Sequence, residues 1–469
     1  MKKLTFLILS LLYTTGMAQT TLSLKECIET ALKNNPAVNQ SGIQAQNSEI
    51  QLQQSRLNKL PGVNASVGHG INQGRSIDPF TNAYVNNQLG YGNYGVSAGV
   101  VLFSGGALNN AVARDRFGYE AARMDLQQAK DNLTIEVILA YLTALTNEDV
   151  LNQMQSQLEL TRKQVERLEV LNRDGSIPPS QLSDLQGQYA GEQLSVISAT
   201  NSVESSRLNL CRLMNVPYSS PMTLEKINPE LPGLYGARAE EVYETALQRF
   251  AAIKAADFRV KSAEKAVDVA RGQLWPTLRL GVNVNTNYSS AASTSTLLNT
   301  NTVASSDFVS IGGAQYPVMR QVSNYASDNI PYTRQLTGNF FSSFGLSLNI
   351  PVFNGLEQRN RVKVARLNVK NNEIAAHAAR TGLDQAIDQA AINLQTALER
   401  CETLERQVQA FKESFRAAET RFNQGVGNSI DYLTAKNNLD RANINLISAQ
   451  YEAVLRSKLL DFYKGETLW

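Results

Sequence analysis

Four segments of the chain alternate between apolar residues and small or polar ones. The first, at about residues 61–72, reads Val-Asn-Ala-Ser-Val-Gly from Val63 to Gly68. The same period of two recurs at about residues 93–103, 276–288 and 340–353. Successive side chains of a strand point to opposite faces, so each segment predicts a strand with one apolar face and one small or polar face. A half-buried sheet in a soluble sandwich and a membrane barrel both show this pattern.

Two longer segments, at about residues 104–215 and 354–464, have helical periodicity instead. No proline interrupts the chain from Ser104 to about Asp174, and a helix of that length would extend roughly 100 Å. Apolar residues recur at spacings of three and four, with Glu192 and Ser206 interrupting the seam. This spacing predicts antiparallel coiled-coil hairpins. Helices of this kind form either a solid bundle or the wall of a tube.

The order of elements occurs twice. Residues 26–67 align without a gap on residues 241–282, and Val96–Gly105 are similar to Leu346–Gly355. The period is much longer than the roughly 20–50 residues of solenoid repeats, so each copy is a structural unit in its own right. We therefore expect an internal tandem repeat, with copies at residues 19–232 and 233–469.

Residues 1–18 have the features of an export signal. Lys2 and Lys3 precede an apolar run from Leu4 to Tyr13, and small residues follow before Gln19. The apolar run is shorter than the ~20 residues that a membrane-spanning helix needs. The residue directly after the expected cleavage site is Gln19 and not a cysteine, so we expect no lipid anchor at the mature N-terminus.

The composition and motifs give little indication of nucleic-acid binding, metal binding or catalysis. The net charge of +2 gives no positive field for nucleic acid. With two histidines, His69 and His377, and no clustered cysteines, the chain offers few ligands for a metal. No HExxH or Walker pattern occurs, and the glycines after Ser104 fit a helix start better than a phosphate loop. We therefore expect no enzyme activity, catalytic residue, metal or cofactor. The three cysteines, which are odd in number and far apart, predict no disulfide framework: Cys27, Cys211 and Cys401.

Export changes the interpretation of the strands. Four strands are too few for a membrane barrel, which needs at least eight, and an open sheet edge in lipid leaves backbone groups without hydrogen bonds. The strands of several copies must therefore be combined in one barrel. The connections Gln73–Gly92 and Thr286–Asn339 are rich in polar residues, so we expect long outward loops. The low-complexity run Ser289–Thr296 predicts that the second loop is partly mobile.

Over nearly its whole mature length, the chain resembles the TolC-type outer-membrane efflux proteins. The resemblance is carried by four segments: Leu24–Pro36, Val101–Gly106, Pro351–Gly355 and Gly425–Leu433. It implies an α+β membrane protein in which a homotrimer forms a 12-stranded β-barrel, with four strands per chain, continued by a periplasmic α-helical barrel. It also implies a passive duct in the outer membrane for small molecules or polypeptides. The implied partners are an inner-membrane transporter and a periplasmic adaptor protein that meets the helical tips.

The resemblance also points to residues at the hairpin ends. Members of this family narrow the periplasmic end of the duct with aspartates just after the final hairpin turn. The matching positions are the gate candidates of this chain: Asp431, Thr434, Gln181 and Asp184. The position of the family's second aspartate holds Thr434, so we expect a weaker carboxylate constriction. The position of its link arginine holds Gly427 and that of its tyrosine holds Phe422, so we do not expect the salt-bridge latch known in the family. A solvated helix face explains Asp431 and Asp184 equally well.

The two hairpin turns are the expected contacts of the adaptor protein. Their residues are Gly175, Ser176, Ile177, Pro178, Gly425, Val426 and Gly427. One alternative is a periplasmic coiled-coil structural or adaptor protein, which would be released with the soluble periplasm rather than with the outer membrane. Another is a surface adhesin that uses the Thr286–Asn339 loop.

Overall fold

The computed structural model describes residues 21–77, 82–86, 88–218, 222–227 and 239–466. The expected export signal at residues 1–18 lies outside the described residues. The chain divides into two compact units. The helical unit comprises residues 1–51, 115–263 and 367–469, and the strand unit comprises residues 52–114 and 264–366. Each unit contains parts of both sequence copies, so the compact units do not follow the repeat boundary.

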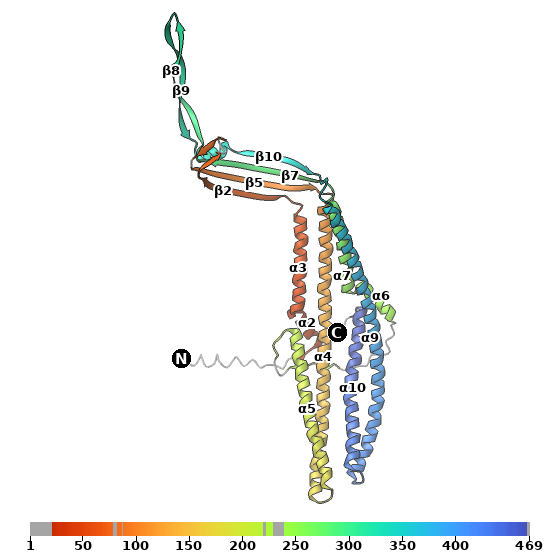
Figure 1. Ribbon diagram of the computed structural model, residues 1–469. Coiled ribbons are helices and arrows are strands. Elements are labelled where there is room, and N and C mark those ends of the chain that lie inside the picture. Colours follow the sequence, from red (N-terminus) through yellow and green to blue (C-terminus); the bar gives the residue numbers. More distant parts are fainter. Residues whose placement is uncertain (1–20, 78–81, 87, 219–221, 228–238, 467–469) are drawn as a thin grey trace, which may run out of the picture. The chain divides into compact units, whose positions relative to one another are not determined.

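Four antiparallel strands form the main sheet of the strand unit (Figure 1). They are β2 (Gly62–Asn72), β5 (Leu89–Phe103), β7 (Thr277–Ser289) and β10 (Phe341–Asn349). Their order is β10-β7-β5-β2. The two central strands come from different sequence copies, so the copies pair at the middle of the sheet. The outer strands β2 and β10 each have one edge without a partner strand within the described chain.

The register separates the two faces of this sheet. Ser97 and Ser343 both lie opposite Asn283 on one face, and Ala98 and Phe344 both lie opposite Val282 on the other. The second face is apolar and exposed in the isolated chain, where the exposed fraction reaches 79% at Val67 and 86% at Phe344. Such a continuous apolar surface requires an apolar environment.

Aromatic side chains lie at both ends of the apolar face. At one end, the His69 Nδ1 atom is hydrogen-bonded to the Tyr94 hydroxyl at 3.0 Å, and its ring stacks on Tyr288 with centroids 5.9 Å apart. At the other end of the sheet, Trp275 precedes β7 and Phe353 follows β10, and both side chains are exposed. Aromatic girdles of this kind flank the apolar band of membrane barrels. His69 is a packed residue at such a girdle.

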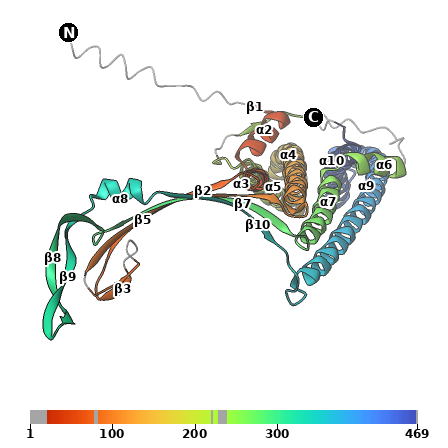
Figure 2. The same cartoon turned by 90° about the horizontal axis from the view of Figure 1, so that it is seen from above.

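The long connection between Thr286 and Asn339, which the sequence pattern predicted only as a polar loop, contains regular structure. These residues contain a two-stranded ribbon, β8 (Ser293–Ile311) with β9 (Ala314–Asn329), and the short helix α8 (Tyr332–Gly338) (Figure 2). Gly312 and Gly313, with φ of 61° and 89°, form the turn, since only glycine adopts two successive positive φ values readily. The preceding connection contains a further pair, β3 (Arg75–Ile77) and β4 (Tyr84–Asn86).

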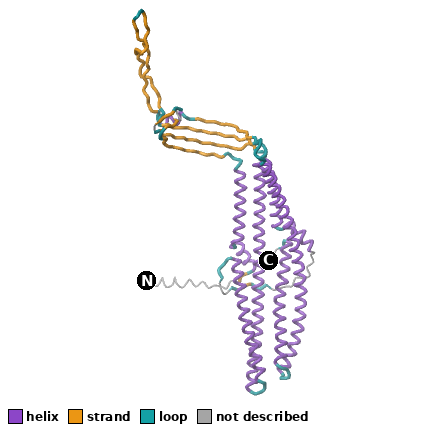
Figure 3. Tube along the Cα trace, viewed as in Figure 1, coloured by secondary structure: helices purple, strands orange, loops and turns teal. Residues whose placement is uncertain are grey.

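The helices have the same lengths in the two copies. The unbroken helices α4 (Ala107–Arg173) and α9 (Glu357–Asn423) each have 67 residues (Figure 3). Their return helices α5 (Pro179–Met214) and α10 (Ser429–Lys464) each have 36. The shorter helices also match: α2 (Leu24–Asn34) and α6 (Ala239–Arg249) have 11 residues, and α3 (Pro36–Leu57) and α7 (Ala251–Gly272) have 22. No helix within the described residues has the length and apolar character to cross a membrane.

The largest apolar core of the helical unit surrounds Tyr141 of α4, which is fully buried. Its hydroxyl donates a hydrogen bond shared between the backbone carbonyls of Leu22, at 3.0 Å, and Glu225, at 2.8 Å. These residues adjoin a short parallel pair, β1 (Thr21–Leu22) with β6 (Thr223–Leu224), which the sequence pattern did not predict. Burial raises the pKa of the Tyr141 hydroxyl, which therefore remains a donor at neutral pH.

The two sequence copies differ where a strand passes into a long helix. Gly105 has φ of 59°, and an added Cβ would lie 2.5 Å from the Gly272 carbonyl oxygen and 2.6 Å from the Trp275 Cβ. The equivalent Gly355 has a similar φ of 62°, but an added Cβ would meet nothing within 4 Å. Gly105 is therefore required both for its backbone conformation and for the close approach of α7.

Gly105→Ala should destabilise the protein more than Gly355→Ala. Both variants incur the left-handed backbone cost of about 1–2 kcal/mol, but only the first creates a clash with backbone. Thermal unfolding followed by circular dichroism should show the lower midpoint for Gly105→Ala. Equal midpoints would contradict the close packing at this position.

Candidate functional site

The two hairpin turns share one backbone geometry. Gly175 and Gly425 follow α4 and α9 with φ of 68° and 75°. In the first turn the Ser176 N–H donates to the Leu171 carbonyl at 2.8 Å, and in the second the Val426 N–H donates to the Arg421 carbonyl at 3.1 Å. These bonds from beyond the helix to its last turn define a Schellman motif with glycine in the left-handed position. The turns therefore end both helices in the same way.

The return helices begin differently. The Asn428 side chain accepts a hydrogen bond from the Asp431 N–H at 2.7 Å, which caps α10. Pro178 precedes α5 and provides no side-chain cap. Of the residues predicted to meet an adaptor, Ile177 and Gly427 are half-buried and the others are exposed. Val426 is 75% exposed, so the second tip presents an apolar side chain to solvent.

The four gate candidates lie on the first turns of the return helices. Gln181 is half-buried, whereas Asp184, Asp431 and Thr434 are exposed in the isolated chain. The Asp184 carboxylate accepts a hydrogen bond from the Ser429 hydroxyl at 3.0 Å, which links the first hairpin to the start of α10. The Asp431 carboxylate has no hydrogen bond or ion pair among the described residues. The two acidic candidates thus differ, because only Asp184 is held by a partner.

An apolar cluster joins the two hairpins near their tips. Val165, Leu168 and Leu185 of the first hairpin pack with Phe422 and Tyr432 of the second. The Phe422 and Tyr432 rings stack with centroids 4.7 Å apart and an interplanar angle of 19°. Burial raises the pKa of the Tyr432 hydroxyl, which has no hydrogen-bond partner among the described atoms. Phe422 therefore joins the two hairpins by apolar packing and not by a polar contact.

A buried cation lies behind this apolar cluster. Lys436 of α10 is 1% exposed, and its Nζ atom lies 2.7 Å from both Glu192 Oε1 of α5 and Asp440 Oδ2 of α10. The Thr161 hydroxyl of α4 donates to Glu192 Oε2 at 2.7 Å. Burial raises the pKa of the Asp440 carboxyl, and the neighbouring ammonium opposes that rise. Lys436 is thus the bridge between a carboxylate of each hairpin.

Two further polar contacts join the hairpins. The Gln188 amide donates to the Asn437 side chain at 2.9 Å. The Arg167 guanidinium donates to the backbone carbonyl of Asn423 at 2.9 Å, at the C-terminal end of α9, where a positive charge is favourable. Sequence reasoning missed these residues. The available signal was Glu192, which interrupts the apolar seam and proves to be a partner of Thr161 and Lys436.

No group of three metal-binding side chains occurs in the part of the chain that the structure describes. The candidate site is instead a packing surface with carboxylates at its exposed end. Such a surface suits the control of a passage or the binding of a protein.

Comparison with known proteins supports this conclusion. The family model described as "Outer membrane efflux protein" matches residues 27–216 and 242–466. These segments include both hairpins and all four strands of the main sheet. The break in the match falls between the two sequence copies.

Individual relatives cover nearly the whole chain. Protein CyaE of Bordetella pertussis is 25% identical over 443 residues, which are 94% of this chain and 82% of that protein. The outer membrane protein TolC of Vibrio cholerae is 23% identical over 439 residues, covering 92% and 88% of the respective chains. The solved structure of VceC from Vibrio cholerae has a TM-score of 0.74 at 15% identity, with 95% of this chain and 97% of that chain covered.

The family match settles the choice between the expected functions. Members of this family are outer-membrane channels with a large periplasmic part, and not soluble adaptors. The expected fold class is also confirmed by the structural relatives. The chain belongs to the outer membrane efflux protein family and is an outer-membrane export channel.

Proposed function

We propose that three copies of this chain form one duct that receives cargo at the helical tips and releases it outside the cell. The main support is the sheet, whose apolar face is exposed and whose edges at β2 and β10 lack partner strands among the described residues. Backbone groups at an open edge cannot be left without hydrogen bonds in lipid. Three four-stranded sheets joined edge to edge satisfy these groups in a 12-stranded barrel.

The hairpin tips are the proposed contact with a periplasmic adaptor protein, which links the duct to an inner-membrane transporter. TolC-type channels work with such partners. The proposal is supported here by the two turns of like geometry and by the exposed Val426. An exposed apolar side chain at a rigid turn is a suitable anchor for a partner helix.

Asp431 is the proposed gate residue. Its carboxylate is exposed and unpaired among the described residues, so three copies near the threefold axis would repel one another and attract cations. Asp184 instead has a structural role in this proposal, because Ser429 holds its carboxylate. Thr434 and Gln181 add polar but uncharged groups to the same turns.

The Lys436 contacts are the proposed connection that holds the two hairpins in register. The ammonium bridges Glu192 and Asp440, and it is almost fully buried. Removing one member of a buried ionic group leaves the others without compensation. The hairpins can therefore separate only if these carboxylates gain another partner or water.

A photo-crosslinking residue at Val426 should test the proposed tip contact. In cells that express the full chain, it should crosslink to a periplasmic protein that mass spectrometry identifies as carrying a coiled-coil hairpin. The same residue placed at Thr302 of β8 should give no such product. Crosslinking to that protein from both positions, or from neither, would count against the tip contact.

Asp431→Ala should increase single-channel conductance in planar bilayers and reduce the preference for cations. The reason is the loss of one carboxylate per copy at the narrow end of the duct. Glu413→Ala, which removes an exposed carboxylate from α9, is the matched control and should change neither quantity. Unchanged conductance and selectivity in Asp431→Ala would remove this residue from the gate.

Lys436→Met should destabilise the folded protein by about 3–5 kcal/mol, the usual cost of breaking a buried ion pair. Combining it with Glu192→Gln and Asp440→Asn should restore much of the loss, because no buried carboxylate then lacks a cation. Lys412→Met, at an exposed position of α9, is the control. Thermal unfolding at pH 7 measures each variant.

The pH dependence of Lys436→Met gives a further check on the same contact. Without the ammonium, the burial that raises the pKa of the Asp440 carboxyl is no longer opposed, so the folded-state pKa of this group lies above its unfolded value. The folded state then binds more protons than the unfolded state, so its stability increases as the pH falls towards the unfolded pKa. The loss of stability in Lys436→Met, relative to the unmodified protein, should therefore be smaller at pH 5 than at pH 8. A loss independent of pH would show that lost packing, and not charge, is responsible.

A further inference from the structure

The four strands of the main sheet contain a single charged side chain of Asp, Glu, Lys or Arg type. This residue is Arg279, the third residue of β7. It lies opposite Val101 of β5 and Ser347 of β10, and its side chain is exposed in the isolated chain. An arginine in a strand otherwise made of small and apolar residues has a large cost if it faces lipid.

The register places Arg279 on the small and polar face. The same face of β7 continues through Gly281, Asn283 and Asn285, while Leu278 and Leu280 point to the apolar face. Since the apolar face must contact lipid, the small and polar face lines the lumen of the proposed barrel. The guanidinium therefore belongs to the lumen.

The neighbouring residues leave space around this side chain. Gly99, Gly281 and Gly345 lie side by side in the next row of the sheet. Together with Arg279 and Ser347 they line a groove of about 550 Å³. An added Cβ at Gly281 or Gly345 would meet nothing within 4 Å, so the groove is open above the backbone.

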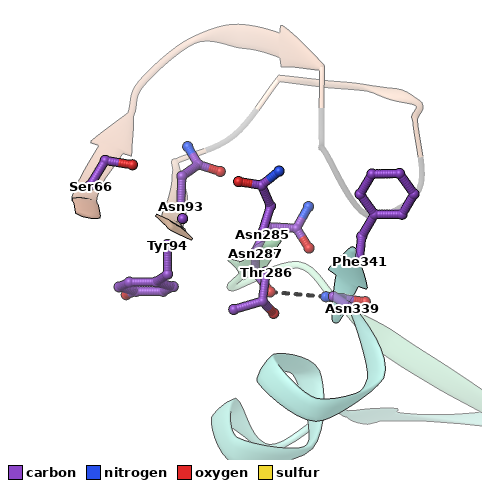
Figure 4. A pocket seen from close by; sticks show the side chains of 9 residues that line it. Ser66, Asn93, Tyr94, Asn285, Thr286, Asn287, Asn339 and Phe341 are labelled. Carbon is purple, nitrogen blue, oxygen red and sulfur yellow. Dashed lines mark hydrogen bonds between the residues drawn. The ribbon is translucent and has the colours of Figure 1, made fainter. Parts of the chain in front are cut away.

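The opposite end of the sheet has a different lining. There the pocket in Figure 4 is lined by hydroxyl, amide and aromatic side chains, without a charged one. Asn339 donates a hydrogen bond to the backbone carbonyl of Asn287 at 2.9 Å in this pocket. The lumen face is thus neutral at the end near β8 and β9, and positively charged at the end from which the long helices continue.

The acidic residues nearest in sequence to this end of β7 and β10 already have partners. Asp268, near the end of α7, lies 2.9 Å from Lys265 and 3.5 Å from Arg271. Glu357, at the start of α9, lies 2.6 Å from Arg361. Among the described residues, Arg279 has no ion-pair partner. The first turns of α9 add positive charge rather than cancelling it, because Arg359, Lys363 and Arg366 follow Glu357.

We propose that Arg279 from each of three copies forms a cationic ring in the lumen, which selects cargo that bears carboxylate or phosphate groups. The proposal rests on the proposed trimeric duct. Twelve strands about 4.8 Å apart and tilted by about 40° enclose a radius of roughly 12 Å. This radius is comparable with the Debye length of about 8 Å at physiological ionic strength. The three arginine side chains extend inwards from the barrel wall, so their positive electrostatic potential reaches most of the cross-section of the lumen.

The chemistry of arginine favours this class of cargo. The guanidinium is always charged and presents a planar set of donors that match carboxylate and phosphate oxygens. Three such groups around an axis bind a multivalent anion without enclosing it, so that the anion can still leave. The ring and the Asp431 carboxylates have opposite charges and lie on different elements. The two sites should therefore act on ion selectivity in opposite directions.

Reversal potentials in a KCl gradient test the ring in planar bilayers. Arg279→Gln should lower the chloride-to-potassium permeability ratio by a factor of about two or more, and Arg279→Lys should keep the ratio of the unmodified protein. Citrate added to the solution should block the unmodified channel at a lower concentration than it blocks Arg279→Gln. An unchanged ratio with unchanged citrate block would overturn the proposal.

Cysteine labelling tests the orientation independently. In Arg279→Cys, a membrane-impermeant, negatively charged thiosulfonate should reduce the current. Leu280→Cys, on the adjacent lipid-facing position, should not respond. A response only at Leu280 would place Arg279 outside the lumen and overturn the proposal. If the unmodified protein forms no channel at all, the proposed trimeric duct is wrong. If it forms a channel whose ion selectivity does not change when Arg279 is replaced, only the cationic ring is wrong.

Discussion

The unpaired edges of a four-stranded sheet are the constraint on which the rest of this structure depends. β2 and β10 each expose a row of backbone donors and acceptors, and the apolar face of the same sheet is exposed. Water could satisfy the edges but not the apolar face, and lipid could cover the face but not the edges. Assembly with further copies is the arrangement that satisfies both. Barrel closure therefore requires an oligomer.

The tandem repeat explains how one chain supplies matched parts to such an assembly. The long helices of the two copies have equal lengths, and their turns end with glycine in the same conformation. The side chains have nevertheless diverged. Lys436 and Asp431 have Gln186 and Gln181 at the corresponding positions of the first hairpin. The shared backbone geometry gives both hairpins the same shape in the wall of the proposed helical barrel, while their different side chains give each hairpin its own role.

The sequence predicted those features that depend on periodicity or local conformation. The strands of the main sheet and the long hairpins follow from periods of two and of about 3.5 residues. The ribbon β8–β9 was missed because its Ser, Thr and Asn residues resemble a loop, although Gly312 and Gly313 are a hairpin signal. Contacts such as Lys436 with Glu192 join residues 244 positions apart, so sequence reasoning could not find them without knowing which helices are neighbours.

Imaging of single particles of the detergent-solubilised protein shows whether closure of the sheet requires three copies. We predict three copies around one axis, with β2 of one copy hydrogen-bonded to β10 of the next and a hollow interior through both strands and helices. A stable monomer whose sheet edges are covered by its own chain, and whose helices form a solid bundle, would contradict this prediction.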